Sequence, residues 1–460
     1  MSIENLQAKA GNGGTCAGSS RDAYAMANEF CAAGFKSYMA GSREEAIRLW
    51  LQSLEIMPDF STAIMNLGGA YKDQGDLGQA ASHFLKALAI QPDMVEANFN
   101  LAVTYHLQGN LDGALAHYLQ TIRIRPDFAD AHINLDVLLY DQVKDPNLAL
   151  ACFQKIREIN PLIDDVGPKR LRLETSSVCN LRCQHCPTGT NYSGTTRNIM
   201  EMAMFDDILC QVKALPILRE VVFYLGGEPL LNKNLPLMCR RVKEETSVTH
   251  TQFTTNGMLI TEELCRQLAE AKVDKIHVSI DGISPEENDE IRRGSRYSTI
   301  VANIQMLVSY LPQTQVGIAN TIFKRPGDPD APLTPEFLRR DFPGLSVWTT
   351  YAMKWPSLNT EKSALAQAGC ETGMQADNFC KMPFSEMAIR PNGDVVMCCY
   401  DLAGEMVMGN IQQLPLLDIW RSLPYKQLRE NMLSRTIHLL PDVCKRCQHY
   451  CGAIPLVRKS

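Results

Sequence analysis

The pattern of apolar and polar positions repeats itself along the first third of the chain. Prolines close each repeat and are separated by 34, 34 and 35 residues: Pro58, Pro92, Pro126 and Pro161. The other positions in register are Gly34, Gly68, Ala102 and Asp136; Ala46, Ala80 and Ala114; and Trp50, Phe84, Tyr118 and Phe153. Small residues let two helices approach, aromatic residues fill the space between them, and proline ends the second helix. The pattern therefore predicts a helix–turn–helix repeat.

From Lys169 onward, short β-prone runs alternate with longer amphipathic stretches. The expected strands are 170–175, 220–225, 249–254, 275–280, 314–322 and 345–351, with helices such as 262–271 and 298–310 between them. Alternating strands and helices predict a parallel sheet whose functional loops follow the carboxyl ends of the strands. The sequence motifs of this region all stand at such ends.

Length and charge narrow the class of protein. Single hydrophobic cores stop growing near ~250–300 residues, so a chain of 460 residues should form more than one domain. The net charge of −6 argues against a nucleic-acid partner. The sequence has no apolar run of about 18 residues and no N-terminal secretion signal. We therefore expect a cytoplasmic protein that binds neither nucleic acid nor membrane.

The chain has sixteen cysteines, and their spacing separates two groups. In a reducing cytosol, cysteines are metal ligands or buried thiols more often than disulfides. Six are scattered singly, and we interpret them as small buried apolar residues: Cys16, Cys31, Cys152, Cys210, Cys239 and Cys265. The other ten lie between Cys179 and Cys186 or from Cys370 onward.

The first expected strand runs into the sequence ETSSVCNLRCQHCP, which contains Cys179, Cys183 and Cys186. Three thiolates with CxxxCxxC spacing on one loop can hold one side of a cubane cluster and leave its fourth iron free. Zinc is the competing interpretation, but closed zinc sites need four ligands, which are usually paired CxxC units. The loop therefore predicts an iron–sulfur site.

The N-terminal repeat resembles the tetratricopeptide repeat, a 34-residue helix–turn–helix unit. We expect four units over residues 27–163, the last degenerate, after a flexible N-terminus of residues 1–26. The resemblance implies a curved all-α solenoid that binds a peptide or protein partner. The alternative is that the repeats only dimerise or stiffen the enzyme.

The central region, residues 169–352, resembles the radical S-adenosylmethionine (SAM) superfamily, with a partial (β/α)6 barrel. CxxxCxxC is its cluster signature, and His185 stands where the family often has an aromatic residue. GGEP resembles the motif whose backbone and carboxylate hold the SAM amino group, while TTNG and VSIDG match positions that contact the ribose and carboxylate. The carried-over residues are Gly226, Gly227, Glu228, Pro229, Thr255, Asn256 and Ser279, with Arg292 and Asn320 as weaker matches.

The resemblance implies the chemistry as well as the fold. A [4Fe–4S] cluster, reduced by flavodoxin or ferredoxin, cleaves SAM to methionine and a 5′-deoxyadenosyl radical, which abstracts hydrogen from an unactivated C–H bond. The barrel must exclude water and stray hydrogen donors. For the general acid or base we name Asp281 and Tyr351, both at strand ends, although Asp281 fits a cap of the following loop equally well.

The last region, residues 353–460, resembles the cysteine-rich SPASM/twitch extension of radical SAM enzymes. The resemblance rests on Cys380, the sequence RPNGDVVMCCYD, and CKRCQHYC. It implies one auxiliary [4Fe–4S] cluster with the ligands Cys380, Cys398, Cys444 and Cys447. Cys399 could replace Cys398, because neighbouring residues of a strand point to opposite faces. Cys370 and Cys451 are left over, and a structural zinc knuckle is the alternative.

The sequence thus predicts three parts: an all-α repeat solenoid, an α/β partial barrel and a small cysteine-rich domain. An auxiliary cluster would accept an electron from the substrate radical, so we expect an oxidative modification of a peptide or protein recruited by the repeats. Two alternatives stay open: a small-molecule dehydrogenase or epimerase that acts on a sugar or aminocyclitol, and a non-catalytic repeat scaffold.

Overall fold

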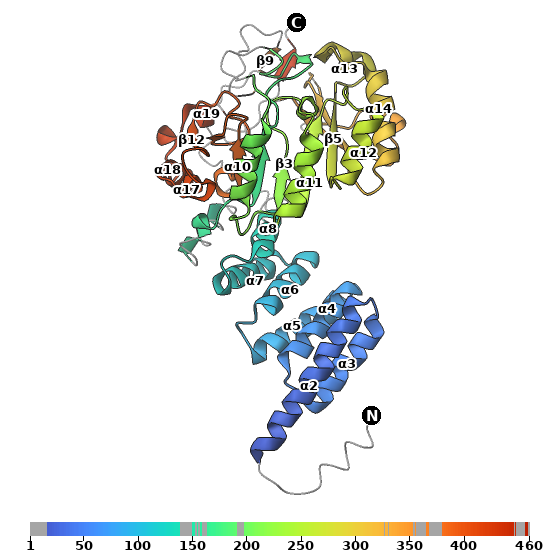
Figure 1. The fold of residues 1–460 in the computed structure, drawn as a ribbon, viewed down its shortest axis with the longest axis vertical. Helices are drawn as coiled ribbons and strands as arrows, with labels where there is room; N and C mark the ends of the chain where they lie inside the picture. The colour runs from blue at the N-terminus through green and yellow to red at the C-terminus, as the bar shows by residue number, and fades with distance from the viewer. Residues whose placement is uncertain are drawn as a thin grey trace. The chain divides into compact units, whose positions relative to one another are not determined.

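A computed structural model describes residues 16–138, 150–151, 154, 157–158, 163–190, 197–325, 327–329, 331–352, 355, 365–367, 380–445, 447 and 456–458. The chain divides into two compact units, Met1–Gln142 and Val143–Ser460. Figure 1 shows a helical first unit and a second unit built around a sheet. None of the described helices is long and apolar enough to cross a membrane.

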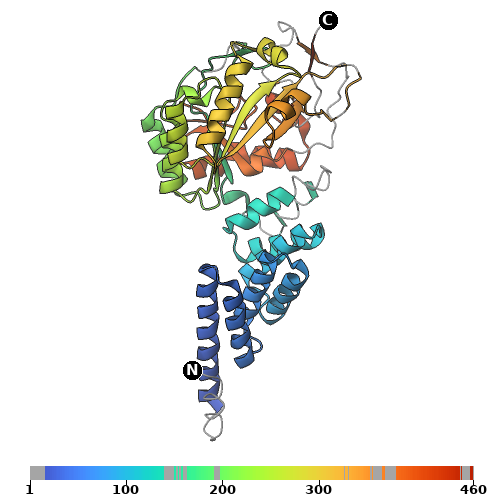
Figure 2. The ribbon, with the colours of Figure 1, turned by 90° about the vertical axis from the view of Figure 1, so that its right-hand side faces the viewer.

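The first unit is a stack of antiparallel helix pairs (Figures 1 and 2). α2 packs on α3, α4 on α5, and α6 on α7, and α8 begins a fourth unit. The bounds are α2 Cys16–Met39, α3 Arg43–Ile56, α4 Ser61–Asp73, α5 Leu77–Ile90, α6 Val95–Leu107, α7 Leu111–Ile124 and α8 Ala129–Val137. The helical-repeat prediction is confirmed here, while Phe153 and Pro161 of the predicted fourth unit lie outside the described residues.

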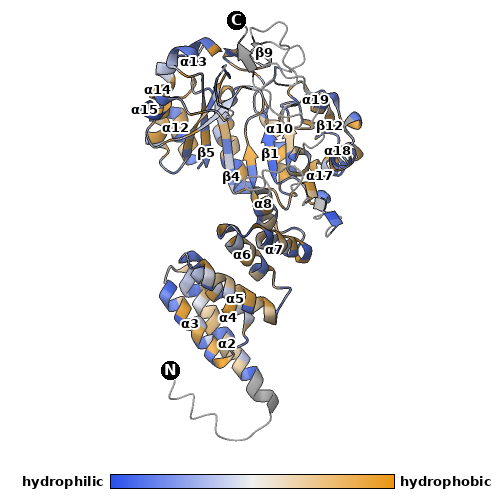
Figure 3. Cartoon of the chain, turned by 180° about the vertical axis from the view of Figure 1, so that it is seen from behind, coloured by the Kyte–Doolittle hydropathy of each residue, from blue (hydrophilic) through white to orange (hydrophobic). Residues whose placement is uncertain are grey.

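The repeated small and aromatic positions pack against each other within each helix pair. A β-carbon on Gly34 would lie 2.6 Å from the Trp50 ring, and one on Gly68 would lie 2.7 Å from the Phe84 ring. Both aromatic side chains are buried. The helices therefore carry an apolar side toward their partners and a polar side toward water, as the mixed colours in Figure 3 show.

The first helix begins at Cys16, whereas the repeat pattern predicts a start at Ala27. The extension packs on the second helix pair, because the rings of Tyr24 and Phe60 meet edge-on with their centroids 5.6 Å apart. The 34-residue period does not predict these additional turns of helix, because they depend on local contacts of this kind.

Nine strands of the described residues form the sheet of the second unit, in the order β12-β11-β10-β1-β3-β4-β5-β7-β8. Six strands run parallel in the expected barrel order: β1 (Arg170–Leu173), β3 (Glu220–Val222), β4 (His250–Thr255), β5 (Lys275–Asp281), β7 (Gln315–Ile322) and β8 (Ser346–Tyr351). The predicted strands begin and end within a few residues of these bounds. The predicted central fold is therefore confirmed.

The sheet continues into the cysteine-rich region. β10 (Glu386–Ile389) lies parallel to β1, and β11 (Asp394–Val396) and β12 (Val407–Asn410) follow it in antiparallel order. A partial barrel leaves β1 with an open edge, and a further strand satisfies its backbone groups. Charge fixes the pairing, because Glu386 accepts hydrogen bonds from Arg170 (2.7 Å) and Arg172 (2.6 Å).

The two faces of the central sheet differ in chemistry. Ile276, Val278 and Ile280 of β5 are fully buried on the outer face. Helices cover this face: α10 (Met202–Val212), α11 (Leu235–Glu245), α12 (Glu262–Glu270) and α14 (Tyr297–Tyr310). The inner face carries the alternate residues, which are largely polar: Arg170, Arg172, Gln252, His277 and Ser279. A polar inner face is what a site for polar cofactors requires.

The scattered cysteines follow the prediction with one exception. Cys31, Cys239 and Cys265 are buried free thiols. Cys210 is exposed, because Phe205, Ile208, Leu209 and Val212 form the buried side of α10 and Cys210 lies on the other side. Cys152 and the side chain of Cys16 lie outside the described residues.

Candidate active site and auxiliary cysteine site

The three-cysteine loop leaves the carboxyl end of β1 and is anchored by a short strand pair. β2 (Arg182–Cys183) pairs antiparallel with β6 (Arg292–Arg293), which sets Cys183 opposite Arg292. The amide of Cys186 donates to the carbonyl of Cys183 over 3.3 Å. The charges of Cys179 and Cys186 act on the Cys183 thiol, so the predicted ligands are gathered in one place.

The surroundings of these thiols keep them protonated in the absence of a metal. Burial raises the pKa of all three, in the case of Cys183 to about 12. Hydrogen bonds oppose this shift: the Leu181 amide donates to Cys179 Sγ over 3.4 Å, and Thr188 and Gly189 donate to Cys186. Without metal the thiols stay protonated at neutral pH, and metal binding must displace those protons.

The GGEP motif packs directly against the cysteine loop. A β-carbon on Gly227 would lie 2.1 Å from the carbonyl oxygen of Ser176, so only glycine fits there. The Gly226 amide donates to Glu174 over 3.1 Å, and the Glu228 amide donates to the Val178 carbonyl over 2.8 Å. These contacts place the backbone of the motif beside Cys179.

The Glu228 carboxylate connects three segments of the site. It accepts hydrogen bonds from Thr255 Oγ1 (2.8 Å), the Asn256 amide (2.8 Å) and the Leu230 amide (3.1 Å). Burial raises the pKa of Glu228, and these three donors oppose the rise. Pro229 begins the 3-10 turn η3 (Pro229–Leu231). GGEP and TTNG, distant in sequence, are therefore bound to each other.

Three further predicted residues lie at the neighbouring strand ends. Asn256 donates to Asn180 Oδ1 over 2.8 Å, which ties TTNG to the cysteine loop. Asn320 donates to the carbonyls of Ile280 (2.8 Å) and Gly282 (3.1 Å). Ser279 lies half-buried on the inner face of β5. All three side chains stand at the carboxyl end of the sheet.

A buried ion pair links the two ends of the site. Arg292 Nη1 donates to Asp281 Oδ2 over 2.9 Å, and His185 Nε2 lies 3.7 Å from the same oxygen. Burial alone would lower the pKa of Arg292, but the charge and hydrogen bond of Asp281 together with the charges of Cys183 and Cys179 outweigh it, and the pKa rises. Asp281 thus holds a cation, and among the described residues its carboxylate accepts from Arg292 and from no amide of the following loop. Tyr351 donates to the Pro329 carbonyl over 2.6 Å. Their catalytic roles stay predictions.

The polar atoms around the end of β5 fit a polar cofactor such as SAM. Three of them are buried without a hydrogen-bond partner among the described residues: His185 Nδ1, Arg292 Nε and Asn320 Oδ1. An unsatisfied buried polar atom costs about 1–3 kcal/mol. A ligand that offers both acceptors and donors would remove this cost.

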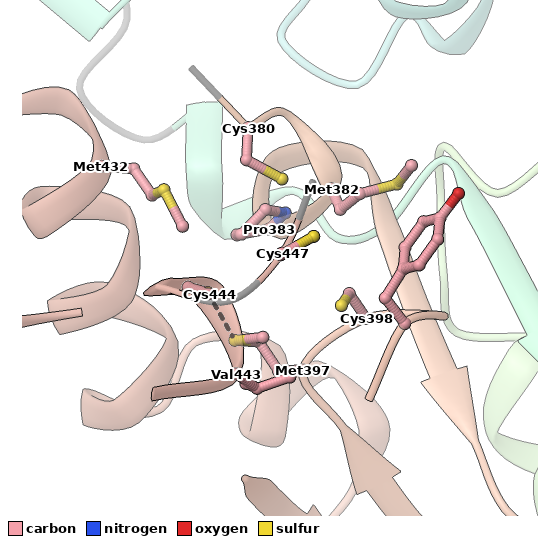
Figure 4. A pocket seen from close by; sticks show the side chains of 10 residues that line it. Cys380, Met382, Pro383, Met397, Cys398, Met432, Val443, Cys444 and Cys447 are labelled. Atoms are coloured by element: carbon pink, nitrogen blue, oxygen red, sulfur yellow. Dashed lines mark hydrogen bonds between the residues drawn. The ribbon is translucent and has the colours of Figure 1, made fainter. Parts of the chain in front are cut away.

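The second cysteine group surrounds a cavity in the C-terminal region. Its lining includes Cys380, Cys398, Cys444 and Cys447. In Figure 4 the sulfur atoms of Cys380, Cys398 and Cys447 turn toward a common space. Burial raises the pKa of Cys398 well above its usual range, and the other cysteines raise it further. Such a group of thiolates is stable only around a cation.

The cavity brings four cysteines into one lining. Four thiolates are the ligand set of one cubane cluster. The four predicted thiols therefore fit an auxiliary cluster.

Cys399 faces away from this cavity. It does not belong to the described lining and packs instead against Leu225, Ala388, Val396 and Leu402. Burial raises the pKa of Cys399 to about 11, while Arg172 opposes the rise. The geometry thus favours Cys398 as the ligand. Cys370 and Cys451 lie outside the described residues.

Motif reasoning misses two residues of the inner face. Burial raises the pKa of Glu174 to about 7, and its carboxylate accepts from the Gly226 amide. Tyr224 lies beside the GGEP motif, where charges of the cysteine loop act on it. Both residues could have been found in the sequence by following the alternation of inward- and outward-facing side chains past the ends of the strands.

Family comparisons agree with this architecture. The model of the radical SAM superfamily matches residues 173–333, that of the SPASM iron–sulfur cluster-binding domain matches residues 380–448, and that of the tetratricopeptide repeat matches residues 65–128. The predicted families occur in the predicted order: a tetratricopeptide repeat, a radical SAM domain and an iron–sulfur cluster-binding domain. The predicted [4Fe–4S] and SAM cofactors and auxiliary iron–sulfur chemistry follow from these domains.

Two relatives differ in how much of their length is matched. The GTP 3′,8-cyclase of Alkaliphilus metalliredigens is 30% identical over 136 residues, which are 29% of this chain and 42% of the cyclase. The SAM-dependent 2-deoxy-scyllo-inosamine dehydrogenase of Niallia circulans is 23% identical over 279 residues, which are 61% of this chain and 92% of the dehydrogenase. The chain thus spans less than half of the cyclase.

Solved structures include BtrN in complex with AdoMet and 2-DOIA, with a TM-score of 0.44 and 20% identity over 61% of this chain and 92% of BtrN. Streptococcus suis SuiB has a TM-score of 0.39 and 19% identity over 69% of this chain and 83% of SuiB. These similarities are too low to assign a substrate.

Proposed function

We propose that the chain catalyses an oxidative radical modification of a peptide or protein that its tetratricopeptide repeats bind. The bound cluster and SAM supply a 5′-deoxyadenosyl radical, which takes a hydrogen atom from a substrate C–H bond. The observation that carries the proposal is the presence of two cysteine sites on one sheet: the three-cysteine loop after β1 and the four-thiol cavity beside β10 and β11.

The chain's own residues divide the work. The thiolates of Cys179, Cys183 and Cys186 would hold the SAM-binding cluster, for which reduced flavodoxin or ferredoxin would be the electron donor. SAM is bound and oriented by backbone groups of the GGEP motif and by polar side chains around it. The backbone groups belong to Gly226, Gly227 and Pro229, and the side chains are those of Glu228, Thr255, Asn256, Ser279, Arg292 and Asn320. The polar atoms without partners at Arg292 and Asn320 support this assignment.

The cavity thiols Cys380, Cys398, Cys444 and Cys447 would hold an auxiliary cluster, which when bound would supply an acceptor for one electron of the substrate. The substrate then releases a proton to a base, for which Asp281 and Tyr351 stay our predictions. The net loss is one hydrogen atom, one electron and one proton, which corresponds to a two-electron oxidation. Four thiols around one cavity support a single auxiliary cluster.

The test is the formation of 5′-deoxyadenosine by anaerobically reconstituted full-length protein with SAM and a strong reductant, measured by mass spectrometry. The wild type should form it, and a Cys179/Cys183/Cys186→Ala variant should not. If an iron-replete wild type forms none, radical chemistry is excluded and the non-catalytic scaffold alternative replaces it.

A small-molecule oxidation is the second candidate, and one comparison favours it. The aligned region covers 92% of a dehydrogenase named for 2-deoxy-scyllo-inosamine but only 61% of this chain. A related reaction on a sugar or aminocyclitol would make the repeats unnecessary for turnover.

A further inference from the structure

Gly226 of the GGEP motif is held by three separate segments of the second unit. Its amide donates to Oε1 of Glu174, which directly follows β1, over 3.1 Å. Its carbonyl accepts from Thr188 Oγ1 of the cysteine loop over 2.7 Å. The third contact comes from the cysteine-rich region, because a β-carbon on Gly226 would lie 3.1 Å from Leu402 Cδ2. The motif assigned to SAM is therefore in contact with the region that carries the auxiliary cysteines.

The Glu174 carboxylate has a second neighbour in the cysteine-rich region. Its Oε2 lies 3.9 Å from Arg390 Nε, and both side chains are only 5% exposed. The sheet brings the two residues together, since β1 pairs in parallel with β10 and each residue directly follows its strand. The Glu174 amide also donates to the Ile389 carbonyl over 2.9 Å. The buried ion pair is thus fixed by the backbone on both sides.

The Arg390 guanidinium also contacts the turn that follows the auxiliary cysteines. Its Nη1 donates to the Ala403 carbonyl over 3.5 Å, and a β-carbon on Gly404 would overlap with the same nitrogen. The turn carries Leu402 as well, which packs in one buried cluster with Leu225, the residue before the GGEP motif. The GGEP backbone is therefore held from the cysteine-rich region by one polar and one apolar contact.

The charge of Arg390 strengthens the polar contact. Burial raises the pKa of Glu174 to about 7, and the Arg390 charge and the Gly226 amide oppose the rise. An ionised carboxylate accepts a stronger hydrogen bond than a neutral acid does. Without its cation a buried carboxylate favours the neutral form. Arg390 therefore supports the hydrogen bond between Glu174 and the Gly226 amide.

We propose that Arg390 is a positioning residue for SAM, because it holds, through Glu174, the backbone of the GGEP motif in the orientation that SAM binding requires. The inference rests on the proposed function, which assigns this motif to SAM. Arg390 acts without touching SAM itself. The cysteine-rich region thus has a second task besides holding a cluster, since it also completes the SAM site.

The test removes the charge with Arg390→Gln in the full-length, anaerobically reconstituted protein. The dissociation constant of SAM, measured by equilibrium dialysis, should rise about tenfold, which is the usual effect of losing one charge-assisted hydrogen bond. The rate of 5′-deoxyadenosine formation at saturating SAM should not change, because the contact contributes equally before and during the reaction. Arg390→Lys keeps a cation and should retain most of the affinity.

A double-mutant cycle tests whether Arg390 acts through Glu174. Glu174→Gln keeps an acceptor for the Gly226 amide but loses the charge, and should weaken SAM binding about as much as Arg390→Gln does. In the variant with both substitutions the two losses should not multiply, because both remove the same interaction. This variant buries no unpaired charge, so with Glu174→Gln it carries the test even if Arg390→Gln alone does not fold.

Arg429→Gln is the matched control in the same region. Arg429 is fully buried and donates to the carbonyls of Pro383 (2.8 Å) and Trp420 (3.0 Å), so its loss should disturb the cysteine-rich region without changing the affinity for SAM. The inference is wrong if Arg390→Gln keeps the wild-type dissociation constant with full iron content. It is also wrong if Arg429→Gln raises that constant equally, or if the losses at Arg390 and Glu174 multiply. A wild type that does not bind SAM contradicts the proposed function itself, so the two failures are distinguishable.

Discussion

At the scale of single residues, burial dominates the chemistry of the candidate active site. Cys183 is 8% exposed, and loss of water raises its pKa by more than the Arg292 cation beside it can offset. Each thiol is therefore a poor ligand until a metal replaces its proton. The site is arranged so that the metal, and not the protein alone, stabilises the thiolates.

This burial predicts how iron loading depends on pH. Thiols with raised pKa values bind protons at neutral pH, and raising the pH removes the proton that iron must displace. Iron bound per chain after reconstitution at fixed iron and sulfide should therefore increase from about pH 7 to about pH 9. The Cys179/Cys183/Cys186→Ala variant should show a smaller total increase. Iron loading that does not change over this range would contradict the raised pKa values.

At the scale of elements, two adjacent glycines of α4 have opposite surroundings. A β-carbon on Gly68 would meet the Phe84 ring at 2.7 Å, whereas one on Gly69 would meet nothing within 4 Å. The first glycine allows two helices to approach, and the second only weakens its helix. The repeat pattern marks Gly68 and not Gly69 as the structural position.

We expect Gly68→Ala to lower the free energy of unfolding by about 1–3 kcal/mol, because the added methyl group overpacks against Phe84. Gly69→Ala should raise it by about 1 kcal/mol, the usual gain of alanine over glycine in a helix. Denaturant unfolding, followed by circular dichroism, measures both. Equal effects of the two substitutions would show that Phe84 can move aside.

The elements also show what the sequence could and could not predict. The six parallel strands and the repeat helices follow from local periodicity, which a single segment carries in full. The pairing of β10 with β1 does not, because it depends on Arg170, Arg172 and Glu386 meeting across a long separation in sequence. The sequence also could not decide whether Cys398 or Cys399 is the cluster ligand, because this depends on which face of one turn lines the cavity.

At the scale of the whole molecule, the boundary between the two units falls after Gln142. The segment that follows belongs to the catalytic unit: Arg157 pairs with Asp164 (2.9 Å) and with Glu430 of α18, Leu423–Leu433 (2.6 Å). A truncation intended to remove only the repeats should therefore keep residues 143–162.

A chain that begins at Val143 separates the two candidate functions. If the substrate is a peptide bound by the repeats, the truncated enzyme should still form 5′-deoxyadenosine without substrate but should lose most of its kcat/KM for the peptide. A small-molecule enzyme should keep its kcat/KM. Turnover is measured by mass spectrometry of the product, with equal iron content in both proteins as the control.

The pairing of β1 with β10 has a consequence for folding during synthesis of the protein. Arg170 and Glu386 are 216 residues apart, so β10 cannot pair with β1 until the residues between them have been synthesised. The repeats depend on neighbouring contacts and fold early, as N-terminal domains do on the ribosome. A folded repeat unit therefore precedes the four-thiol cavity, whose lining includes Cys444 and Cys447.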